Sequence, residues 1–557
     1  MTREETVRVT IDGTSAETVA GRPLRDLLRS VGGEDIWGAN PVVLAVVNGR
    51  RAHLREPLWG DEHVRLVRLD DPEAHSTTER TVCALLAVAA EQLYPDLRLV
   101  IDFSYGGGLY GELRSNGDPV VADLPRLEAR MRELAARDLP LRPRVFAQRE
   151  LLRLLERSRR EFSLRAVRYA PQESFTLYNM EGSELLFYGL QLPSTGCVRA
   201  FSLLPETPGF VLLSSQAGRP DVTPSPVPQP KLLESMRGYS RWAEIQGFPD
   251  VGSLNRFVAE GRSAEVVHVE EARHEQTLVA AAARTTALPD DGRLILIAGP
   301  SSSGKTSFAK RLAVQLRVLG FTPLALSLDD YFVPRERTPR GESGEYDYES
   351  LAALQVDLFN EHLAALMAGK AVRLPRYDFQ AGTSTQREEE LRVTRGQPLL
   401  VEGIHGLNPD LTPAVPRHQK LQIYVSALCH YNIDDLSYIS THLTRLFRRI
   451  VRDAKYRGYK ASQTLARWPR VREGEQRWVF PFQQNADIFF NAGLAYELGV
   501  LKLWAEPRLA AVEPDDPNFG PARSLSDLLS LILPLDAGQV PPTSLLREFI
   551  GGSGFQY

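Results

Sequence analysis

One eight-residue segment, Gly299-Pro-Ser-Ser-Ser-Gly-Lys-Thr306, limits the folds open to this chain more than any other feature. It satisfies the pattern G-x-x-x-x-G-K-[ST], in which glycines let backbone N–H groups approach phosphate oxygens. A short apolar run, residues 294–298, precedes it and predicts a buried parallel strand. Hydrophobic residues then recur at helical spacing from Phe308 to Leu319, and Gly320 can end that helix. Strand, loop and helix therefore occur in the order that phosphate binding at a helix N-terminus requires.

This loop predicts a nucleotide site with Mg·ATP as the ligand. Lys305 is expected to reach the β- and γ-phosphates, and the Thr306 hydroxyl is expected to coordinate Mg²⁺. The remaining predicted ATP contacts are the glycines and serines of the loop and of the first helical turn, namely Gly299, Ser301, Ser302, Ser303, Gly304 and Ser307. The alternative interpretation is a Gly/Ser turn before an ordinary helix.

Carboxylates follow two further predicted strands. The run 324–328 leads into Asp329-Asp330, and the run 398–401 leads into Glu402. The carboxyl ends of parallel strands face the ligand crevice of a sheet. Asp329 is therefore the predicted base for the proton of an acceptor alcohol, and Glu402 is predicted to lie on the Mg²⁺ side or to order a water. The alternative for the paired aspartates is a solvated turn or a helix N-cap.

A basic segment, residues 444–460, supplies candidates for transition-state charge. On a helix, Arg445, Arg449 and Arg452 share one face and Arg448 lies beside it. Guanidinium groups suit a transferring phosphoryl group because they donate bidentately and stay charged. A charge run is also typical of a solvated helix face, and RNA binding would require interleaved aromatic residues that this run lacks. After a phosphate-binding loop and two carboxylates, we favour a lid helix that directs Arg449 and Arg452 at the phosphoryl group.

The pattern along the whole chain predicts an α/β protein of several domains. Residues 1–70 alternate in hydrophobicity, and Asp12-Gly13 and Asn48-Gly49 predict hairpin turns. Five prolines between Gly218 and Pro230 exclude regular structure and indicate a linker. The predicted divisions are a β-rich module at 1–70, a mixed α/β domain at 75–217, a linker and helical connector at 218–290, a parallel-sheet domain at 291–510 and a C-terminal tail at 511–557.

The composition excludes several classes of protein. The net charge of −4 provides no global basic field for nucleic acid, so a nucleic-acid partner is not favoured. The N-terminus is charged and unlike a secretory signal, and no apolar run is long enough to span a bilayer. The three cysteines, Cys83, Cys197 and Cys429, lie far apart and suit reduced thiols. These features predict a cytoplasmic protein with no membrane partner.

The second half of the chain resembles the uridine/cytidine kinase family, which is similar to phosphoribulokinase. The resemblance implies transfer of the ATP γ-phosphoryl group to a nucleoside 5′-hydroxyl, with Asp329 as general base. It also implies that Asp347 holds the ribose hydroxyls and that Tyr377 and Phe332 lie beside the acceptor. The motifs that carry it occur in family order: Gly299 to Thr306, Ser327-Leu-Asp-Asp-Tyr-Phe332, Tyr346-Asp-Tyr348, Arg376-Tyr-Asp-Phe379, Glu402-Gly-Ile404 and Arg445 to Gly458.

The same resemblance assigns phosphate-facing roles to Arg449, Arg452 and Arg457, and it implies a homo-oligomer. Two base-reading positions differ from the family pattern. No histidine occurs in residues 380–383, and Tyr459-Lys460 follows Gly458 where the family has an arginine. Changed hydrogen-bonding groups alter substrate choice more than chemistry. The acceptor is therefore either a nucleoside or another small alcohol such as a sugar phosphate.

The first half resembles the N-terminal part of threonyl-tRNA synthetase. Residues 1–70 look like its TGS module, a β-grasp fold, and residues 75–217 look like its α+β editing domain. The resemblance is carried by Leu85-Leu-Ala87, Leu93-Tyr-Pro95 and Leu192-Pro-Ser-Thr-Gly196. The four positions that carry histidine and cysteine in the editing site are here Arg80, Ala84, Phe187 and Gln191. None of these repeats imidazole chemistry or binds a metal well, so editing activity is not expected.

The combined architecture resembles a group of bacterial nucleoside or uridine kinase-like proteins, through Trp468-Pro469, Phe480 to Gln483 and Leu546 to Ser553. The favoured hypothesis is a Mg·ATP-dependent kinase of a small-molecule alcohol. The alternative from another class is a nucleotide-dependent regulatory or RNA- or ribosome-associated binding protein, which rests on analogy with TGS modules.

Overall fold

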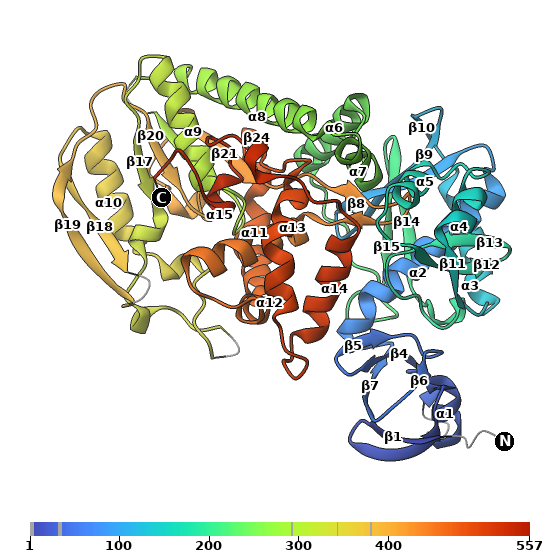
Figure 1. The fold of residues 1–557 in the computed structure, drawn as a ribbon. Coiled ribbons are helices and arrows are strands. Elements are labelled where there is room, and N and C mark those ends of the chain that lie inside the picture. The colour runs from blue at the N-terminus through green and yellow to red at the C-terminus, as the bar shows by residue number, and fades with distance from the viewer. Residues whose placement is uncertain (1–4, 32–35, 291–292, 342–343, 379–380, 557) are drawn as a thin grey trace.

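The computed structural model describes residues 5–31, 36–290, 293–341, 344–378 and 381–556. Its N-terminal module lies apart at the lower right of Figure 1, below a region of mixed sheets at the upper right. A parallel sheet with its helices occupies the left of the same view. The chain therefore contains one parallel α/β region and two β-rich regions that precede it in the sequence.

The N-terminal module is a five-stranded sheet in the order β2-β1-β7-β4-β5. Asp12 and Gly13 have φ angles of 45° and 85°, and Asn48 and Gly49 have φ angles of 48° and 80°. These are the left-handed conformations of two-residue hairpin turns, so both turn predictions are confirmed. The elements are β1 (Thr6–Ile11), β2 (Thr14–Val19), β3 (Arg22–Pro23), α1 (Leu24–Val31), β4 (Val42–Val47), β5 (Arg50–Ala52), β6 (Pro57–Leu58) and β7 (Glu62–Arg68).

The second region packs helices on two antiparallel sheets. Its first helix is α2 (His75–Leu93), the middle of which is buried on all sides. The strands are β8 (Arg98–Tyr105), β9 (Gly108–Ser115), β10 (Asp118–Val120), β14 (Phe201–Glu206) and β15 (Gly209–Ser214) in one sheet, and β11 (Pro143–Ala147), β12 (Ser174–Met180) and β13 (Ser183–Leu186) in the other. The further helices are α3 (Leu124–Ala136), α4 (Gln148–Leu155) and α5 (Glu161–Arg168).

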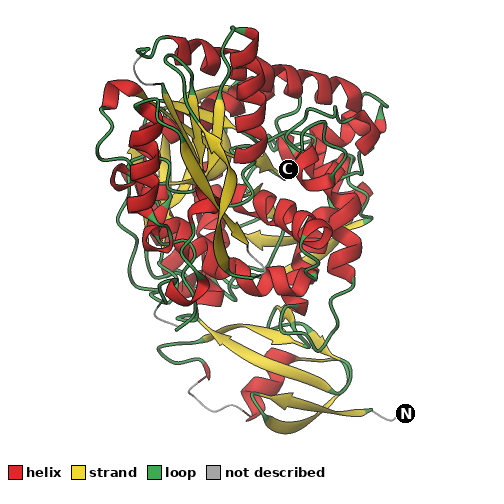
Figure 2. Cartoon of the chain, turned by 90° about the vertical axis from the view of Figure 1, so that its left-hand side faces the viewer, coloured by secondary structure: helices red, strands yellow, loops and turns green. Residues whose placement is uncertain are grey.

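The third region contains the predicted parallel sheet, with strand order β17-β20-β16-β21-β24 and only parallel pairs. Helices flank the strands in the rotated view of Figure 2. The strands are β16 (Leu294–Ala298), β17 (Leu324–Ser327), β20 (Leu399–Glu402), β21 (Lys420–Ser426) and β24 (Ile488–Asn491). The helices are α9 (Lys305–Val318), α10 (Val356–Met367), α11 (Thr441–Tyr456), α12 (Ala461–Trp478), α13 (Glu497–Ala510), α14 (Phe519–Ser530) and α15 (Arg547–Ile550). The predicted α/β class is confirmed.

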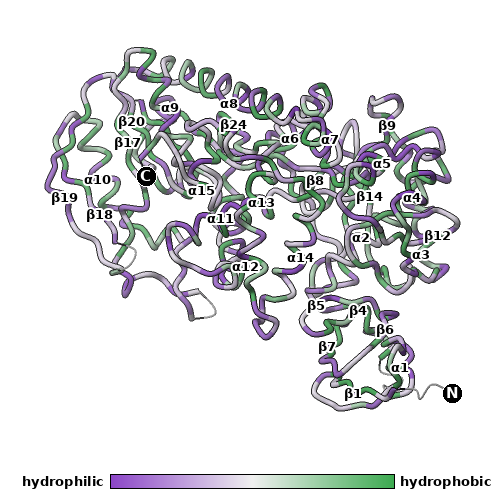
Figure 3. The backbone as a smooth tube through the Cα atoms, viewed as in Figure 1, coloured by the Kyte–Doolittle hydropathy of each residue, from purple (hydrophilic) through white to green (hydrophobic). Residues whose placement is uncertain are grey.

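A hairpin projects from this region at the outer edge of the molecule. It consists of β18 (Val372–Asp378) and β19 (Thr383–Leu391). β19 is largely hydrophilic in Figure 3, and most of its residues are exposed. The hairpin thus presents one polar strand to solvent and one strand to the core.

The proline-rich segment leads into three helices, α6 (Pro230–Gln246), α7 (Val251–Ala259) and α8 (Ser263–Thr286). One hydrophobic cluster includes Leu278 of α8, Ile295 of β16, Phe308 of α9 and Phe549 of α15. The connector and the C-terminal segment therefore share the core of the parallel-sheet region. Within the part of the chain that the structure describes, none of these helices is long and apolar enough to cross a bilayer.

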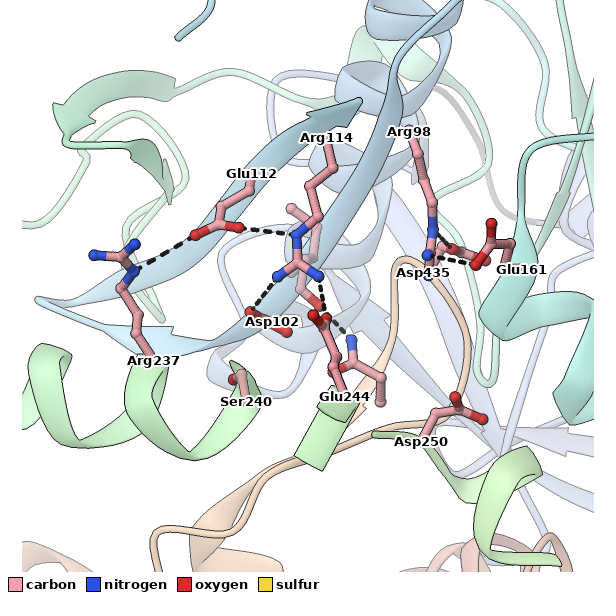
Figure 4. A network of polar contacts seen from close by, with 12 residues as sticks. Arg98, Asp102, Glu112, Arg114, Glu161, Arg237, Ser240, Glu244, Asp250 and Asp435 are labelled. Carbon is pink, nitrogen blue, oxygen red and sulfur yellow. Dashed lines mark hydrogen bonds and ion pairs between the residues drawn. The ribbon is translucent and has the colours of Figure 1, made fainter. Parts of the chain in front are cut away.

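A loop of the parallel-sheet region enters the second region. It lies between β21 and α11 and contains β22 (Tyr431–Asn432) and β23 (Tyr438–Ile439). The Asn432 amide donates to the carbonyl of Ile101 at 2.7 Å, and Leu436 joins the cluster that contains Cys83. The buried Asp435 accepts from the Ser163 N–H and hydroxyl and pairs with Arg98 at 2.7 Å (Figure 4). This loop anchors the two regions to each other.

A second network of charged residues joins the sheet that contains β8 and β9 to α6. Arg114 on β9 lies between Asp102 at 3.2 Å, Glu112 at 2.8 Å and Glu244 of α6 (Figure 4). Arg237 of α6 also reaches Glu112, at 3.5 Å. Burial raises the pKa of Asp102 to about 6, although the charge of Arg114 opposes this shift. Charges from both regions thus compensate one another inside their interface.

We expect Asp435→Ala to lower the free energy of unfolding by about 3–5 kcal/mol, because Arg98 then loses its buried partner. Urea unfolding followed by tryptophan fluorescence measures the change. Asp96→Ala is the control, since Asp96 pairs with Arg159 at 3.1 Å but its side chain is 89% exposed. Exposed pairs of this kind contribute about 0–1 kcal/mol. Equal unfolding midpoints for the two variants would contradict an anchoring role for Asp435.

Candidate active site

The predicted phosphate-binding loop connects β16 to α9 in a strained, open conformation. Ser302 has a φ angle of 58° and Gly304 one of 91°, which are left-handed values. A Cβ on Gly299 would lie 1.9 Å from the carbonyl oxygen of Val425, so the close approach of β21 requires glycine there. The hydroxyls of Ser302 and Ser303 are buried without a hydrogen-bond partner among the described residues. Donors of this kind are available for an anion.

Arg445 supports this loop rather than facing its ligand side. Its guanidinium contacts both carboxylate oxygens of Glu475, at 2.5 and 2.7 Å, and donates to the carbonyl of Ser301 at 3.0 Å. The same Glu475 accepts the Ser301 N–H at 2.9 Å. One ion pair between α11 and α12 therefore holds both the N–H and the carbonyl of a single loop residue.

Arg448 supports the other side of the loop. It is fully buried and forms a two-pronged pair with Glu497, at 2.5 and 3.0 Å. It also donates to the carbonyls of Ser303 at 3.2 Å and Ala492 at 2.7 Å. The basic run is therefore not a solvated face, and two of its arginines are structural parts of the site.

Three further arginines converge on one carboxylate. Arg449, Arg452 and Arg457 lie 3.4, 3.1 and 3.5 Å from Asp453. Arg449 also donates to the Ser301 hydroxyl at 2.7 Å, which places it at the loop. Burial and the charge of Arg452 lower the pKa of both Arg449 and Arg457. These three arginines and one aspartate carry a net positive charge beside the loop. The negative charge of a phosphate would reduce the repulsion among the guanidinium groups.

Glu402 lies at the end of β20, beside the hydroxyls of two neighbouring elements. Its Oε1 accepts from Ser327 at 2.9 Å and from Thr306 at 3.4 Å. Burial, followed by the charge of Asp329, raises the pKa of Glu402 to about 7. Lys305 opposes that shift, while its ammonium group donates to the carbonyl of Pro300 at 3.1 Å.

These oxygens fit a Mg²⁺ ion that is shared with a nucleotide. No cluster of three or more His, Cys, Asp or Glu side chains in the described ranges could hold a metal by itself. Mg²⁺ binds ordinarily through one or two protein oxygens, several waters and substrate phosphates. The Thr306 hydroxyl and the desolvated Glu402 carboxylate match that requirement, and a bound cation would offset the burial of the carboxylate.

The two adjacent aspartates differ in environment. Both lie in a short 3-10 helix, Leu328–Tyr331, that begins directly after β17. Asp330 pairs with Arg387 of the hairpin at 2.7 Å, whereas Asp329 is exposed. The Asp329 N–H donates to the Ser327 hydroxyl at 3.3 Å, which ties it to the Glu402 group. Asp329 is therefore the carboxylate of this pair that is open to an acceptor.

The predicted acceptor residues lie along the hairpin and a neighbouring loop. The rings of Phe332 and Tyr377 have centroids 5.5 Å apart, and Tyr348 lies 6.2 Å from Phe332. Asp347 accepts from the N–H of Glu349 at 3.1 Å. Of residues 380–383, where the sequence analysis finds no base-reading histidine, Gln380 lies outside the described residues, as does Phe379 of the preceding motif.

The sequence reasoning missed two carboxylates. Glu349 follows Tyr348, and burial together with the charge of Glu475 raises its pKa to about 7, although Arg449 and Lys305 oppose this shift. Its position directly after the Tyr-Asp-Tyr motif was the available signal. The other is Glu548 in α15, whose carboxylate contacts Ser307 of α9. No pattern in the sequence indicates that contact.

The four changed editing positions lie in a filled core. Phe187 is 3% exposed and Ala84 is 1% exposed, in the cluster that also contains Leu436. Gln191 is fully buried, and Arg80 donates to the carbonyl of Leu190 at 3.2 Å. Two of the predicted positions are thus apolar and buried, and the other two carry an amide and a guanidinium group.

Comparisons with known proteins match two different parts of the chain. Residues 294–497 match the model of the Phosphoribulokinase / Uridine kinase family. The N-terminal region is similar to threonine–tRNA ligases, with 33% identity over 192 residues to that of Rubrobacter xylanophilus and 28% over 202 residues to that of Geobacillus kaustophilus. These alignments cover 34% and 36% of this chain and 29% and 30% of the two ligases. The chain thus spans less than a third of the length of these curated relatives.

Solved structures with local similarity include a possible uridine kinase from Bacillus stearothermophilus, at 25% identity and a TM-score of 0.24. That alignment covers 28% of this chain and 80% of the other. A D-glycerate 3-kinase from Cryptococcus neoformans aligns at 14% identity and a TM-score of 0.20, over 46% of this chain and 87% of the other. The family match supports a P-loop kinase of a small-molecule alcohol in residues 294–497, joined to an N-terminal region similar to threonine–tRNA ligases.

Proposed function

We propose that this chain transfers the γ-phosphoryl group of Mg·ATP to a hydroxyl of a nucleoside or a related small alcohol. One observation carries the proposal: three arginines share Asp453 beside a loop whose Ser302 and Ser303 hydroxyls have no partner in the described chain. Such an excess of positive charge and donors suits the oxygens of a transferring phosphoryl group. The match to a family of kinases supports the same reaction.

Nucleotide binding is the first step of the proposed reaction. The N–H groups of the loop and of the first turn of α9 take the phosphate oxygens, and Lys305 reaches the β- and γ-phosphates. The Thr306 hydroxyl and the Glu402 carboxylate would hold Mg²⁺. When bound, the metal ion neutralises charge on the transferring phosphoryl oxygens.

Phosphoryl transfer then needs a base and a charge clamp. The acceptor oxygen attacks the γ-phosphorus, the bond from that phosphorus to the β–γ bridging oxygen breaks, and ADP leaves. Asp329 accepts the proton of the acceptor hydroxyl, for which its exposed position at the end of β17 is suitable. Arg449, Arg452 and Arg457 neutralise the phosphoryl oxygens and exclude water as they close over them.

The acceptor would bind between Asp347 and the aromatic pair of Phe332 and Tyr377. A carboxylate suits a ribose or another polyol because it can accept hydrogen bonds from two hydroxyls, and aromatic rings can cover an apolar face. The changed base-reading positions leave a sugar phosphate or similar alcohol as the second candidate acceptor. Homo-oligomer formation stays a prediction that size-exclusion chromatography with light scattering would test.

An acceptor screen tests the proposed reaction. Purified protein is incubated with Mg·ATP and separate nucleosides, sugars, sugar phosphates and polyols, and ADP release is followed. We expect release that depends on one acceptor class and is absent in Lys305→Ala, because the lysine is needed at the phosphates. Release with a non-nucleoside alone would replace the acceptor and keep the chemistry. ATP binding without any acceptor-dependent release would favour the regulatory interpretation.

Asp329→Asn separates catalysis from binding. We expect the turnover rate to fall by about 10²–10⁴-fold, because the acceptor proton loses its base. The dissociation constant for ATP should remain nearly unchanged, which isothermal titration calorimetry would measure. Asp330→Asn is the matched control, since Asp330 is adjacent but is held by Arg387. Full turnover in Asp329→Asn would remove Asp329 from the role of base.

The arginines of α11 should divide into two classes on substitution. Arg452→Gln is expected to lower turnover with little change in the unfolding midpoint, since Asp453 keeps Arg449 and Arg457 as partners. Arg448→Gln is expected to lower the free energy of unfolding by about 3–5 kcal/mol, because Glu497 is left buried and unpaired. Thermal unfolding and ADP release, measured on both variants, distinguish the two effects. A stable Arg448→Gln protein would contradict the supporting role given to Arg448.

A further inference from the structure

The C-terminal segment lies directly against the phosphate-binding loop. A Cβ on Gly304 would lie only 2.3 Å from a methyl carbon of Leu545, so the leucine fills the space that this glycine leaves. Leu546, Phe549 and Ile550 are buried in the same core as the parallel sheet. The guanidinium of Arg448 lies over the ring of Phe549, with its carbon 5.2 Å from the ring centroid. The segment is therefore a packed part of the site.

Within this segment, Glu548 contacts the first turn of α9. Its Oε2 accepts from the Ser307 hydroxyl at 2.6 Å and from the Ser307 N–H at 3.3 Å. Ser307 is the third residue of α9, so its N–H belongs to the group that has no partner within the helix. The N–H groups of this turn are also the donors that a P-loop offers to nucleotide phosphates. A carboxylate of the chain itself thus occupies phosphate donors.

The charges around Glu548 agree with this position. Burial lowers the pKa of Lys310, and the charge of Glu548 opposes this shift. A nucleotide phosphate at Ser307 would bring a second anion onto the same donors. Two like charges about 4 Å apart repel even near a protein surface. The carboxylate and a phosphate would therefore compete for the Ser307 donors.

We propose that residues 545–556 form a gate of the nucleotide site, in which Glu548 holds the Ser307 donors until a nucleotide phosphate displaces it. The inference rests on the proposed function, because it needs nucleotide binding at this loop. Gly551 and Gly552, with φ angles of 84° and 72°, give the segment a sharp turn directly after α15. Lys455 of α11 donates to the carbonyl of Ile550 at 2.7 Å, and Lys310 donates to the carbonyl of Gln556. Displacement of Glu548 would thus also act on α11, which carries the arginines.

A gate of this kind lowers the apparent nucleotide affinity by the fraction of molecules in which it is open. Glu548→Gln keeps the shape of the side chain and removes its charge. Glu548→Ala removes both. Because hydrogen bonds to a charged group are about twice as strong as neutral ones, we expect about tenfold tighter ADP binding in both variants.

Titration calorimetry of the full-length protein with Mg·ADP measures this change. Glu513→Gln is the control, since Glu513 is an exposed carboxylate in the same half of the chain. Tighter binding by both Glu548 variants, with the control unchanged, supports the gate. Equal or weaker binding by Glu548→Gln overturns it, because the carboxylate would then support the site. Absence of binding in the unsubstituted protein, equal to that of Lys305→Ala, would instead refute the proposed function itself.

Hydrogen exchange gives a second measurement that does not depend on the variants. We expect saturating Mg·ADP to speed amide exchange in residues 545–556, while exchange in β16 and α9 slows. Slower exchange in residues 545–556 would overturn the gate, since it would show that the nucleotide tightens the segment.

Discussion

The guanidinium group of Arg448 has no exposed surface and joins three separate parts of the chain at the site. It binds Glu497 at the start of α13, the carbonyl of Ala492 after β24 and the carbonyl of Ser303 in the loop. The left-handed Ser302 next to this contact is in a sparsely populated conformation that the surroundings must hold. A buried charge without its partner is costly, so the loss of Glu497 would also disturb the contacts of Arg448 with Ala492 and Ser303. The conformation of the loop therefore depends on this ion pair.

Local patterns were enough to predict the strand, loop and helix around residues 294–319 and both N-terminal hairpin turns, because each depends on neighbouring residues. The different roles of the arginines in α11 could not be predicted from the sequence. Arg445 and Arg449 are four residues apart and chemically identical, yet one is paired with Glu475 and the other reaches the Ser301 hydroxyl. Their partners come from distant parts of the chain, and only tertiary packing brings them together. The sequence could name these arginines as candidates but could not assign a partner to each of them.

The positions predicted to have lost the editing residues lie in a core that the parallel-sheet region also enters. The loop between β21 and α11 inserts Leu436 into the core that contains the changed positions. Its Asp435 is held by Arg98 and Ser163, and α11 begins only two residues after β23 ends. The orientation of the arginine helix is therefore tied to the synthetase-like region. An N-terminal half that had lost its own chemistry would still be required to place the arginines.

Helix α11 is thus constrained from both ends. The interdomain loop holds its start, and the carbonyl of Ile550 accepts from Lys455 in its last turn. A nucleotide that displaces Glu548 would act on the second of these contacts and leave the first, because buried pairs hold Arg445 and Arg448. Arg449, Arg452 and Arg457 lie in the second half of the helix and at its C-cap, on the side of the Lys455 contact. The buried pairs and the C-terminal segment together therefore favour a lid that closes only after the phosphate has taken the place of the carboxylate.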